Sequence, residues 1–213
     1  MWTLFLKDFN GKSLFLPDRF LTSDSLNLFT DASGSLGYGA VFGSKWFSGT
    51  WNDLWRSQSI TLLELYPIVL AVELWGESLA NKCLSFYTDN LALVDILNKQ
   101  TSKDRLIMTL LRRLVLTCLQ LNLVFQAVHI PGKDNTLADL LSRLQVDKFK
   151  RLAPWADSNP VQDVLLLGIH NNNIVFTYHT EEGRYQNTAQ IYSYMMTRLC
   201  LHPLDFPLIS VVA

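Results

Sequence analysis

The stretch LNLFTDASGSLGYGAVFGSKWFSGT, residues 26–50, contains three short apolar runs separated by glycine and serine. The runs cover 26–31, 37–42 and 45–50, and a Gly-Ser pair joins the last two. Two short runs joined in this way are typical of a β-hairpin. The stretch therefore predicts three neighbouring antiparallel strands.

Downstream of these strands, segments of helical and strand character alternate. The Leu-, Glu- and Ala-rich stretch 59–79 favours a helix over a strand, and we expect Pro67 to bend or interrupt an early turn. The order of all elements, βββ-α-β-α-α-β-α, indicates an α/β fold with a mixed sheet flanked by helices. The remaining predicted elements are a strand over 83–88, a helix capped by Asp89 and Asn90 that ends near Lys99, a helix over 103–122, a strand over 123–129 and a helix over 135–145.

The length of 213 residues suits one domain of ordinary size with a small appendage. Pro154, Asn159 and Pro160 mark a boundary between the two. Beyond it we predict a strand over 164–169, a hairpin around 181–183 and a helix over 188–201, none of which carries a chemical motif.

Composition excludes several classes of protein. Hydrophobic residues make up 49% of the chain, so it can build a core and is not a disordered tail. No apolar run is long enough to span a bilayer, and residues 1–16 do not resemble a signal peptide. Cys83, Cys118 and Cys200 are odd in number and lie in apolar runs, which favours buried thiols in a reducing compartment over disulfides. We expect an intracellular protein without a membrane segment, cytoplasmic or nuclear.

Charge is distributed unevenly along a chain whose net charge is −1. Residues 101–157 contain nine Lys and Arg against five Asp, a local net charge of +4. This basic region is compatible with phosphate binding, and equally with ordinary helix faces exposed to solvent.

Four acids occupy unusual places, at the ends or inward faces of apolar elements: Asp31, Glu64, Asp89 and Asp139. Glu73 lies nine residues after Glu64, on the opposite helix face, so we predict that Glu73 faces water and Glu64 faces the sheet. Each acid alone is open to a second interpretation, as a helix cap or turn residue. Buried together, four carboxylates require neutralisation, and oxygen-only ligands suit Mg²⁺ or Mn²⁺. Two such ions can hydrolyse a phosphodiester.

The motifs around these acids resemble the ribonuclease H domain of retrotransposon reverse transcriptases. They are FTDAS at 29–33, LEL at 63–65, YTDN at 87–90 and HIPGKDNTLADLLSR at 129–143. The last is most similar to gypsy-type and DIRS-type elements. The resemblance covers about 24–150 and extends to the LAPW segment at 152–155.

The resemblance implies an RNase H-like fold, with a five-stranded mixed sheet flanked by helices and the four acids at one edge. It divides the chain into a connecting segment (1–23), a nuclease domain (24–150), a linker (151–160) and a C-terminal extension of unknown role (161–213). The connecting segment is similar to the one that joins such domains to a polymerase.

The same resemblance implies the activity, which is metal-dependent hydrolysis of the RNA strand of RNA–DNA hybrids. Asp31, Glu64, Asp89 and Asp139 would be both catalytic residues and ligands of two Mg²⁺ or Mn²⁺ ions. His129 is a candidate auxiliary residue, although the loop that follows it is short. Hybrid affinity could depend on a reverse transcriptase polymerase portion, because the basic protrusion of some relatives is absent. Candidate substrate-binding residues are Ser33, Asn90, Arg112, Arg113, Asn135 and Arg143. For the two asparagines, a role as the N-cap of the following helix is an equally good interpretation.

Two other kinds of protein remain as alternatives. The main one is a catalytically silent remnant that binds hybrid or RNA without cutting it. Another nuclease of the same superfold fits less well, because a proofreading exonuclease would carry Asp-x-Glu where this chain has Asp31-Ala32-Ser33. An integrase or transposase would carry a glutamate on its last helix.

Overall fold

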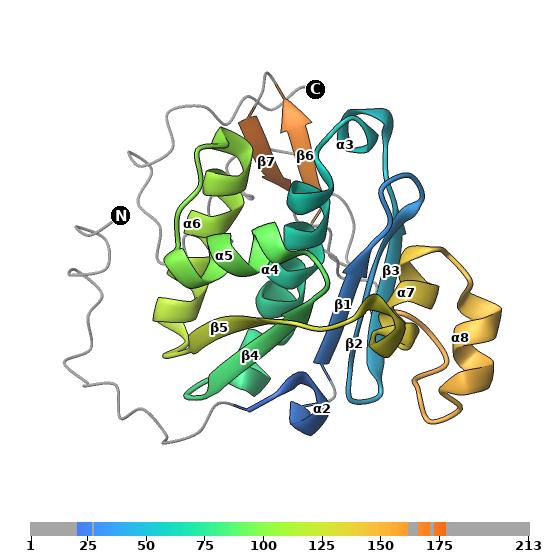
Figure 1. Ribbon diagram of the computed structural model, residues 1–213. Coiled ribbons are helices and arrows are strands. Elements are labelled where there is room, and N and C mark those ends of the chain that lie inside the picture. The colour runs from blue at the N-terminus through green and yellow to red at the C-terminus, as the bar shows by residue number, and fades with distance from the viewer. Residues whose placement is uncertain (1–20, 27, 162–165, 171–172, 178–213) are drawn as a thin grey trace.

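The computed structural model describes residues 21–26, 28–161, 166–170 and 173–177, and it shows an α/β fold (Figure 1). The predicted hairpin around 181–183, the predicted helix over 188–201 and the connecting segment up to residue 20 lie outside these residues. In chain order the elements are α2 (Ser23–Leu26), β1 (Leu28–Ala32), β2 (Gly37–Phe42), β3 (Lys45–Thr50), α3 (Asp53–Arg56), α4 (Ile60–Leu79), β4 (Cys83–Thr88), α5 (Leu91–Lys99), α6 (Arg105–Gln120), β5 (Val124–His129), the 3₁₀-helix η1 (Gly132–Asp134), α7 (Thr136–Ser142), α8 (Val146–Leu152), β6 (Leu166–His170) and β7 (Asn173–Thr177).

The first three strands form an antiparallel sheet in the order β1-β2-β3, as predicted. The β2–β3 hairpin turns at Gly43, whose φ of 58° lies in the left-handed region that glycine adopts without a steric penalty. Asp31 is in register with Gly39, which in turn is in register with Ser48. This register places the acid at the end of β1, at the edge of the sheet.

The predicted single five-stranded sheet is wrong in its hydrogen bonding, because the structure has two sheets here. β4 and β5 form a separate parallel pair, and β1 contacts β4 without forming a ladder with it (Figure 1). At Leu84, Leu21 makes an isolated parallel bridge to β4 and exchanges backbone hydrogen bonds with Cys83 and Ser85. Leu21 therefore occupies a hydrogen-bonding position on β4. A third sheet, the antiparallel pair β6–β7, includes most of the strand predicted over 164–169.

Helix α4 is the central element of the core. Its N-cap is Ser59, whose side chain accepts a hydrogen bond from the Leu62 N–H. The helix continues through Pro67 to Leu79, so the predicted interruption at this proline does not occur. Because α4 packs against β1 and β2 as well as α6, its residues are buried around most of its circumference.

The prediction that Glu73 faces water is wrong. Its side chain is 8% exposed and that of Arg113 on α6 is 7% exposed, and the two form a bidentate ion pair with N–O distances of 2.6 and 2.9 Å. Thr117 donates a further hydrogen bond to Glu73 at 2.6 Å. Glu73 does lie on the opposite face from Glu64, but α6 covers that face.

Helix α7 approaches β1 and β2 closely (Figure 1). A Cβ at Gly39 would overlap the side chain and backbone of Leu141, so the absence of a side chain at this position allows the contact. Ser48 on β3 donates a hydrogen bond to the Leu141 carbonyl at 2.8 Å. These contacts hold α7, which carries Asp139, over the edge of the sheet at Asp31.

The segment after α7 packs on the sheet as well. The predicted boundary at residue 150 falls inside α8, whose Phe149 is buried against Trp46 of β3. The Trp46 indole N–H donates to the Asp157 carbonyl at 2.8 Å, and Asp157 N–H donates to the Ser44 carbonyl at the same distance. The segment predicted as a linker thus lies along the domain.

Two expectations from composition concern the described residues directly. Cys83 and Cys118 are buried free thiols, as expected, while Cys200 lies outside this part of the chain. Within the same part, no helix has the length and apolar character needed to cross a membrane.

Candidate carboxylate site

The four acids singled out in the sequence come from four different elements. Asp31 lies on β1, Glu64 on α4 and Asp139 on α7, while Asp89 directly follows β4. Their charges act on one another, since Asp139 and Asp89 raise the pKa of Asp31, and Asp89 and Asp31 raise that of Glu64. The fold therefore brings together carboxylates that are up to 108 positions apart in the chain.

Asp31 is partly buried near the end of β1. Burial is the main cause that raises its pKa to about 6, and the neighbouring carboxylates add to the rise. The Ser142 hydroxyl donates a hydrogen bond to Asp31 Oδ2 at 2.5 Å, which opposes the rise by stabilising the charged form. A carboxyl group with this pKa loses its proton near neutral pH and more readily beside a cation.

Glu64 is in a similar environment. Burial raises its pKa to about 7, with smaller contributions from the charges of Asp89 and Asp31. The Thr88 hydroxyl donates to Glu64 Oε2 at 2.6 Å and opposes the rise. Because Thr88 is the last residue of β4, this bond ties Glu64 to the strand end that precedes Asp89.

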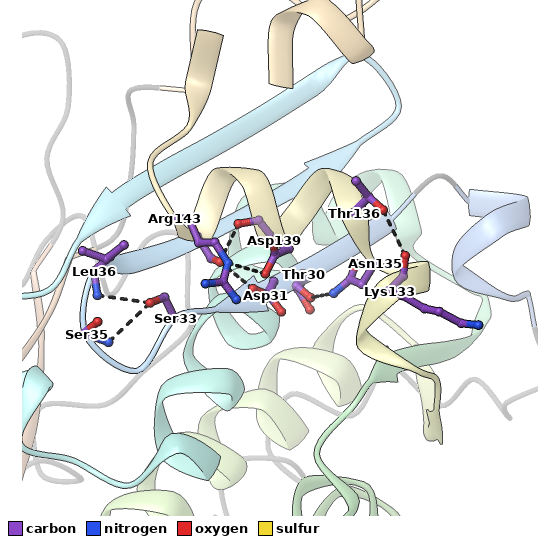
Figure 2. A network of polar contacts seen from close by, with 11 residues as sticks. Thr30, Asp31, Ser33, Ser35, Leu36, Lys133, Asn135, Thr136, Asp139 and Arg143 are labelled. Atoms are coloured by element: carbon purple, nitrogen blue, oxygen red, sulfur yellow. Dashed lines mark hydrogen bonds and ion pairs between the residues drawn. The ribbon is translucent and has the colours of Figure 1, made fainter. Parts of the chain in front are cut away.

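Asp139 is paired with a cation, Arg143, one turn later on α7 and in its C-cap position (Figure 2). The distance from Arg143 Nε to Asp139 Oδ1 is 2.7 Å, and the side chains are 53% and 38% exposed. The ion pair therefore lies at the open edge of the site.

Asp89 is exposed and is approached by the loop that precedes α7. A Cβ at Gly132 would lie 2.5 Å from Asp89 Oδ2. Only a residue without a side chain fits there while Asp89 keeps its position.

The two asparagines occupy structural positions. Asn90 is the N-cap of α5, as predicted, and its Oδ1 accepts from the Leu93 N–H at 3.1 Å. Asn135 is 6% exposed and donates from Nδ2 to the Thr30 carbonyl at 2.9 Å (Figure 2). Asn135 makes no capping hydrogen bond, and its Oδ1 is buried without a hydrogen-bond partner among the described residues, so the substrate contact stays a prediction. The Asn135 side chain ties the start of α7 to β1.

The predicted substrate arginines differ in their surroundings. The guanidinium of Arg113 is buried in an ion pair with Glu73, which does not favour the predicted phosphate contact. Its neighbour Arg112 is exposed on α6, so a phosphate contact there stays a prediction.

Ser33 and His129 lie near the ends of strands. The Ser33 hydroxyl accepts long hydrogen bonds from the Ser35 and Leu36 N–H groups at 3.4 and 3.3 Å (Figure 2). His129 is exposed and is the last residue of β5, in register with Thr88. The auxiliary role of His129 and the substrate role of Ser33 stay predictions.

Two residues of the site were missed in the sequence, the hydroxyl donors Thr88 and Ser142. Both lie inside the quoted motifs, Thr88 directly before Asp89 and Ser142 one helical turn after Asp139. A hydroxyl residue close to a motif acid could have indicated these two donors. The sequence could not show which acid each hydroxyl contacts, because Thr88 bonds to Glu64 and Ser142 to Asp31, in distant segments.

The donor set agrees in its chemistry with a hard divalent cation, which prefers oxygen ligands. A cation would also offset the burial and mutual repulsion that raise the pKa values of Asp31 and Glu64. In the described part of the chain, however, no three His, Cys, Asp or Glu side chains are grouped to hold one ion. The four carboxylates therefore suit a divalent cation in their chemistry, while their side chains are not arranged around one ion position.

No protein-family model matches the chain, and no curated protein is found to be similar to it.

Proposed function

We propose that this protein is an RNase H-like, Mg²⁺- or Mn²⁺-dependent endonuclease that hydrolyses the RNA strand of RNA–DNA hybrids. The observation that carries the proposal is the convergence of Asp31, Glu64, Asp89 and Asp139 from four separate elements, where neighbouring acids help to raise the pKa values of Asp31 and Glu64. A helix cap or a turn residue has no need of neighbouring carboxylates, so ordinary structural roles do not explain why four acids lie near one another. Strongly perturbed carboxyl groups at one edge of a fold are typical of functional sites.

The arrangement of strands supports the proposal. The sheet β1-β2-β3 lies with β1 beside β4 of the β4–β5 pair, which is an order compatible with a five-stranded mixed arrangement. The motifs that carry the four acids resemble those of retrotransposon ribonucleases H in the same chain order. The family assignment rests on these motifs.

The residues of the site have distinct roles in the proposed reaction. Bound divalent cations would supply an activated water and stabilise the leaving oxygen. Ser142 and Thr88 orient the carboxylates of Asp31 and Glu64 through hydrogen bonds of 2.5 and 2.6 Å. Asp139 and Asp89, at the more open side, are the acids that a nucleic-acid strand can approach.

One observation favours a second candidate, a silent remnant that binds hybrid or RNA. Among the residues the structure describes, no three acids are grouped around a single ion position. A protein of this kind would bind hybrid without cleaving it in any divalent metal.

The test is cleavage of a labelled RNA–DNA hybrid by the full chain, with duplex DNA and duplex RNA as comparison substrates. We expect cleavage with Mg²⁺ or Mn²⁺ and none with Ca²⁺ or a chelator. Asp31→Asn should abolish cleavage and keep the fold, because the amide still accepts from Ser142. The matched control is Asp53→Asn, on a side chain that is 98% exposed and lies on α3, and it should cleave like the parent.

Three results separate the candidates. Cleavage that persists in chelator contradicts the metal-dependent mechanism. An Asp31→Asn variant as active as the parent removes Asp31 from the catalytic site. Tight hybrid binding with no cleavage in Mg²⁺ or Mn²⁺ favours the remnant.

A further inference from the structure

Arg143 is a cation that the fold places against Asp139 and near Asp31. In the described residues it is the one basic side chain in an ion pair with any of the four acids. The hydrogen bond and charge of Asp139, and less strongly the charge of Asp31, raise the pKa of Arg143. The site therefore contains four carboxylates and one internal positive charge.

This positive charge lies against one of the oxygens that Asp139 could offer to a metal ion. Arg143 Nε lies 2.7 Å from Asp139 Oδ1. A divalent cation on the same oxygen would lie within a few ångströms of the guanidinium, and the two like charges would repel each other. Arg143 and a cation therefore compete for Asp139.

The hydroxyl partners of the other acids differ in this respect. Ser142 and Thr88 are neutral donors, each bonded to one oxygen of Asp31 or Glu64. A neutral hydroxyl does not repel a cation, and a carboxylate has further lone pairs to offer. Competition with a metal is thus specific to Arg143.

The ion pair is also easy to open. Its side chains are 53% and 38% exposed, and they lie four residues apart at the end of a seven-residue helix. An exposed pair of this kind shifts an equilibrium only about two- to fivefold. The guanidinium can therefore move into solvent while the backbone of α7 stays in place.

We propose that Arg143 is an internal counter-ion that neutralises Asp139 in the metal-free site and leaves it when a divalent cation binds. The inference rests on the proposed function, because it requires the carboxylates to be metal ligands. Once released, the guanidinium lies at the rim of the site, where it can pair with a phosphate of the nucleic acid. Arg143 is thus a positioning residue that links metal binding to substrate binding.

The first test is calorimetric titration of the full chain with MnCl₂, without nucleic acid. We expect Arg143→Gln to bind Mn²⁺ about two- to fivefold more tightly than the parent, because the competing charge is removed. Arg143→Lys keeps the charge and should bind close to the parent. The control Arg56→Gln removes another exposed arginine that pairs with an aspartate on its own helix, Asp53, and should leave the affinity unchanged.

The second test uses the parent protein, so it does not depend on how a variant folds. The side-chain Nε–H signal of Arg143 is assigned in NMR spectra by its absence from Arg143→Gln. Titration with MgCl₂ should shift this signal as the hydrogen bond to Asp139 opens, while the Arg56 signal stays in place.

The outcomes are distinguishable. If Arg143→Gln binds Mn²⁺ no more tightly than the parent, or if the Arg143 signal is unchanged while Mg²⁺ binds, the counter-ion inference is wrong and the metal site stands. If the parent binds neither ion, the proposed nuclease function fails, and the inference fails with it.

Discussion

Replacing Glu64 with glutamine should stabilise the metal-free protein above neutral pH. Burial and the charges of Asp89 and Asp31 raise the pKa of Glu64 from its ordinary 4.5 to about 7. At about 1.4 kcal/mol per pH unit, keeping this group ionised in the folded protein costs about 3 kcal/mol. Glutamine removes the charge and still accepts the hydrogen bond from Thr88.

The pH dependence has a definite sign. Between pH 4.5 and about 7, the folded protein holds the Glu64 proton and the unfolded chain has lost it. Stability therefore falls as pH rises through this window and levels off above it. The parent and Glu64→Gln should be equally stable near pH 4 and diverge by about 3 kcal/mol at pH 8, or about 6–12 °C in melting temperature.

The assay is urea or thermal unfolding in EDTA from pH 4 to 8. The control is Glu77→Gln, the same chemical change on an exposed residue of the same helix, and it should shift stability by about 0.5 kcal/mol or less at every pH. Mn²⁺ should then stabilise the parent more than Glu64→Gln, because an ion that binds only the folded state raises its stability. A difference between the parent and Glu64→Gln that is constant across pH, or a variant less stable than the parent at pH 8, would refute the electrostatic account of the site.

Two further predictions concern residues outside the four acids. Glu73→Gln should lower the free energy of unfolding by about 3 kcal/mol in a denaturant titration, because it removes one charge of a buried, bidentate ion pair with Arg113; an unchanged midpoint would contradict the buried ion pair. Gly132→Ala should push the Asp89 carboxylate aside, since the new Cβ would lie 2.5 Å from Asp89 Oδ2. Cleavage of hybrid by Gly132→Ala should fall at least about tenfold. Its free energy of unfolding should fall by about 1 kcal/mol or less. A fully active Gly132→Ala variant would show that cleavage does not depend on the position of Asp89.

The sequence alone determined the local elements, because their signals lie within a few residues of where they act. The hairpin over 37–50 follows from its glycines, and the N-cap of α5 follows from Asn90 at the end of an apolar strand. The four acids were also identifiable in sequence, since a carboxylate inside an apolar run is unusual wherever the run packs. What such signals predict is the α/β class and the identity of the candidate site residues.

Only the tertiary structure decided what covers each face and which side chains meet. Helical spacing correctly placed Glu73 on the face opposite Glu64. It could not show whether that face meets solvent or another helix. In the structure α6 covers it, and Glu73 forms a buried ion pair with Arg113. The five strands also form two hydrogen-bonded sheets in place of the single sheet expected.

The partners within the site were decided in the same way. Asp31 meets Ser142 across 111 positions of sequence, and Asn135 is buried because its amide reaches the Thr30 carbonyl on β1. Hydrogen bonds of this kind depend on how α7 docks over Gly39, which is a property of packing between distant segments. Residue type and spacing predict the local secondary structure and the chemical groups that a segment carries. Burial and ion pairing depend on which distant segments pack against it.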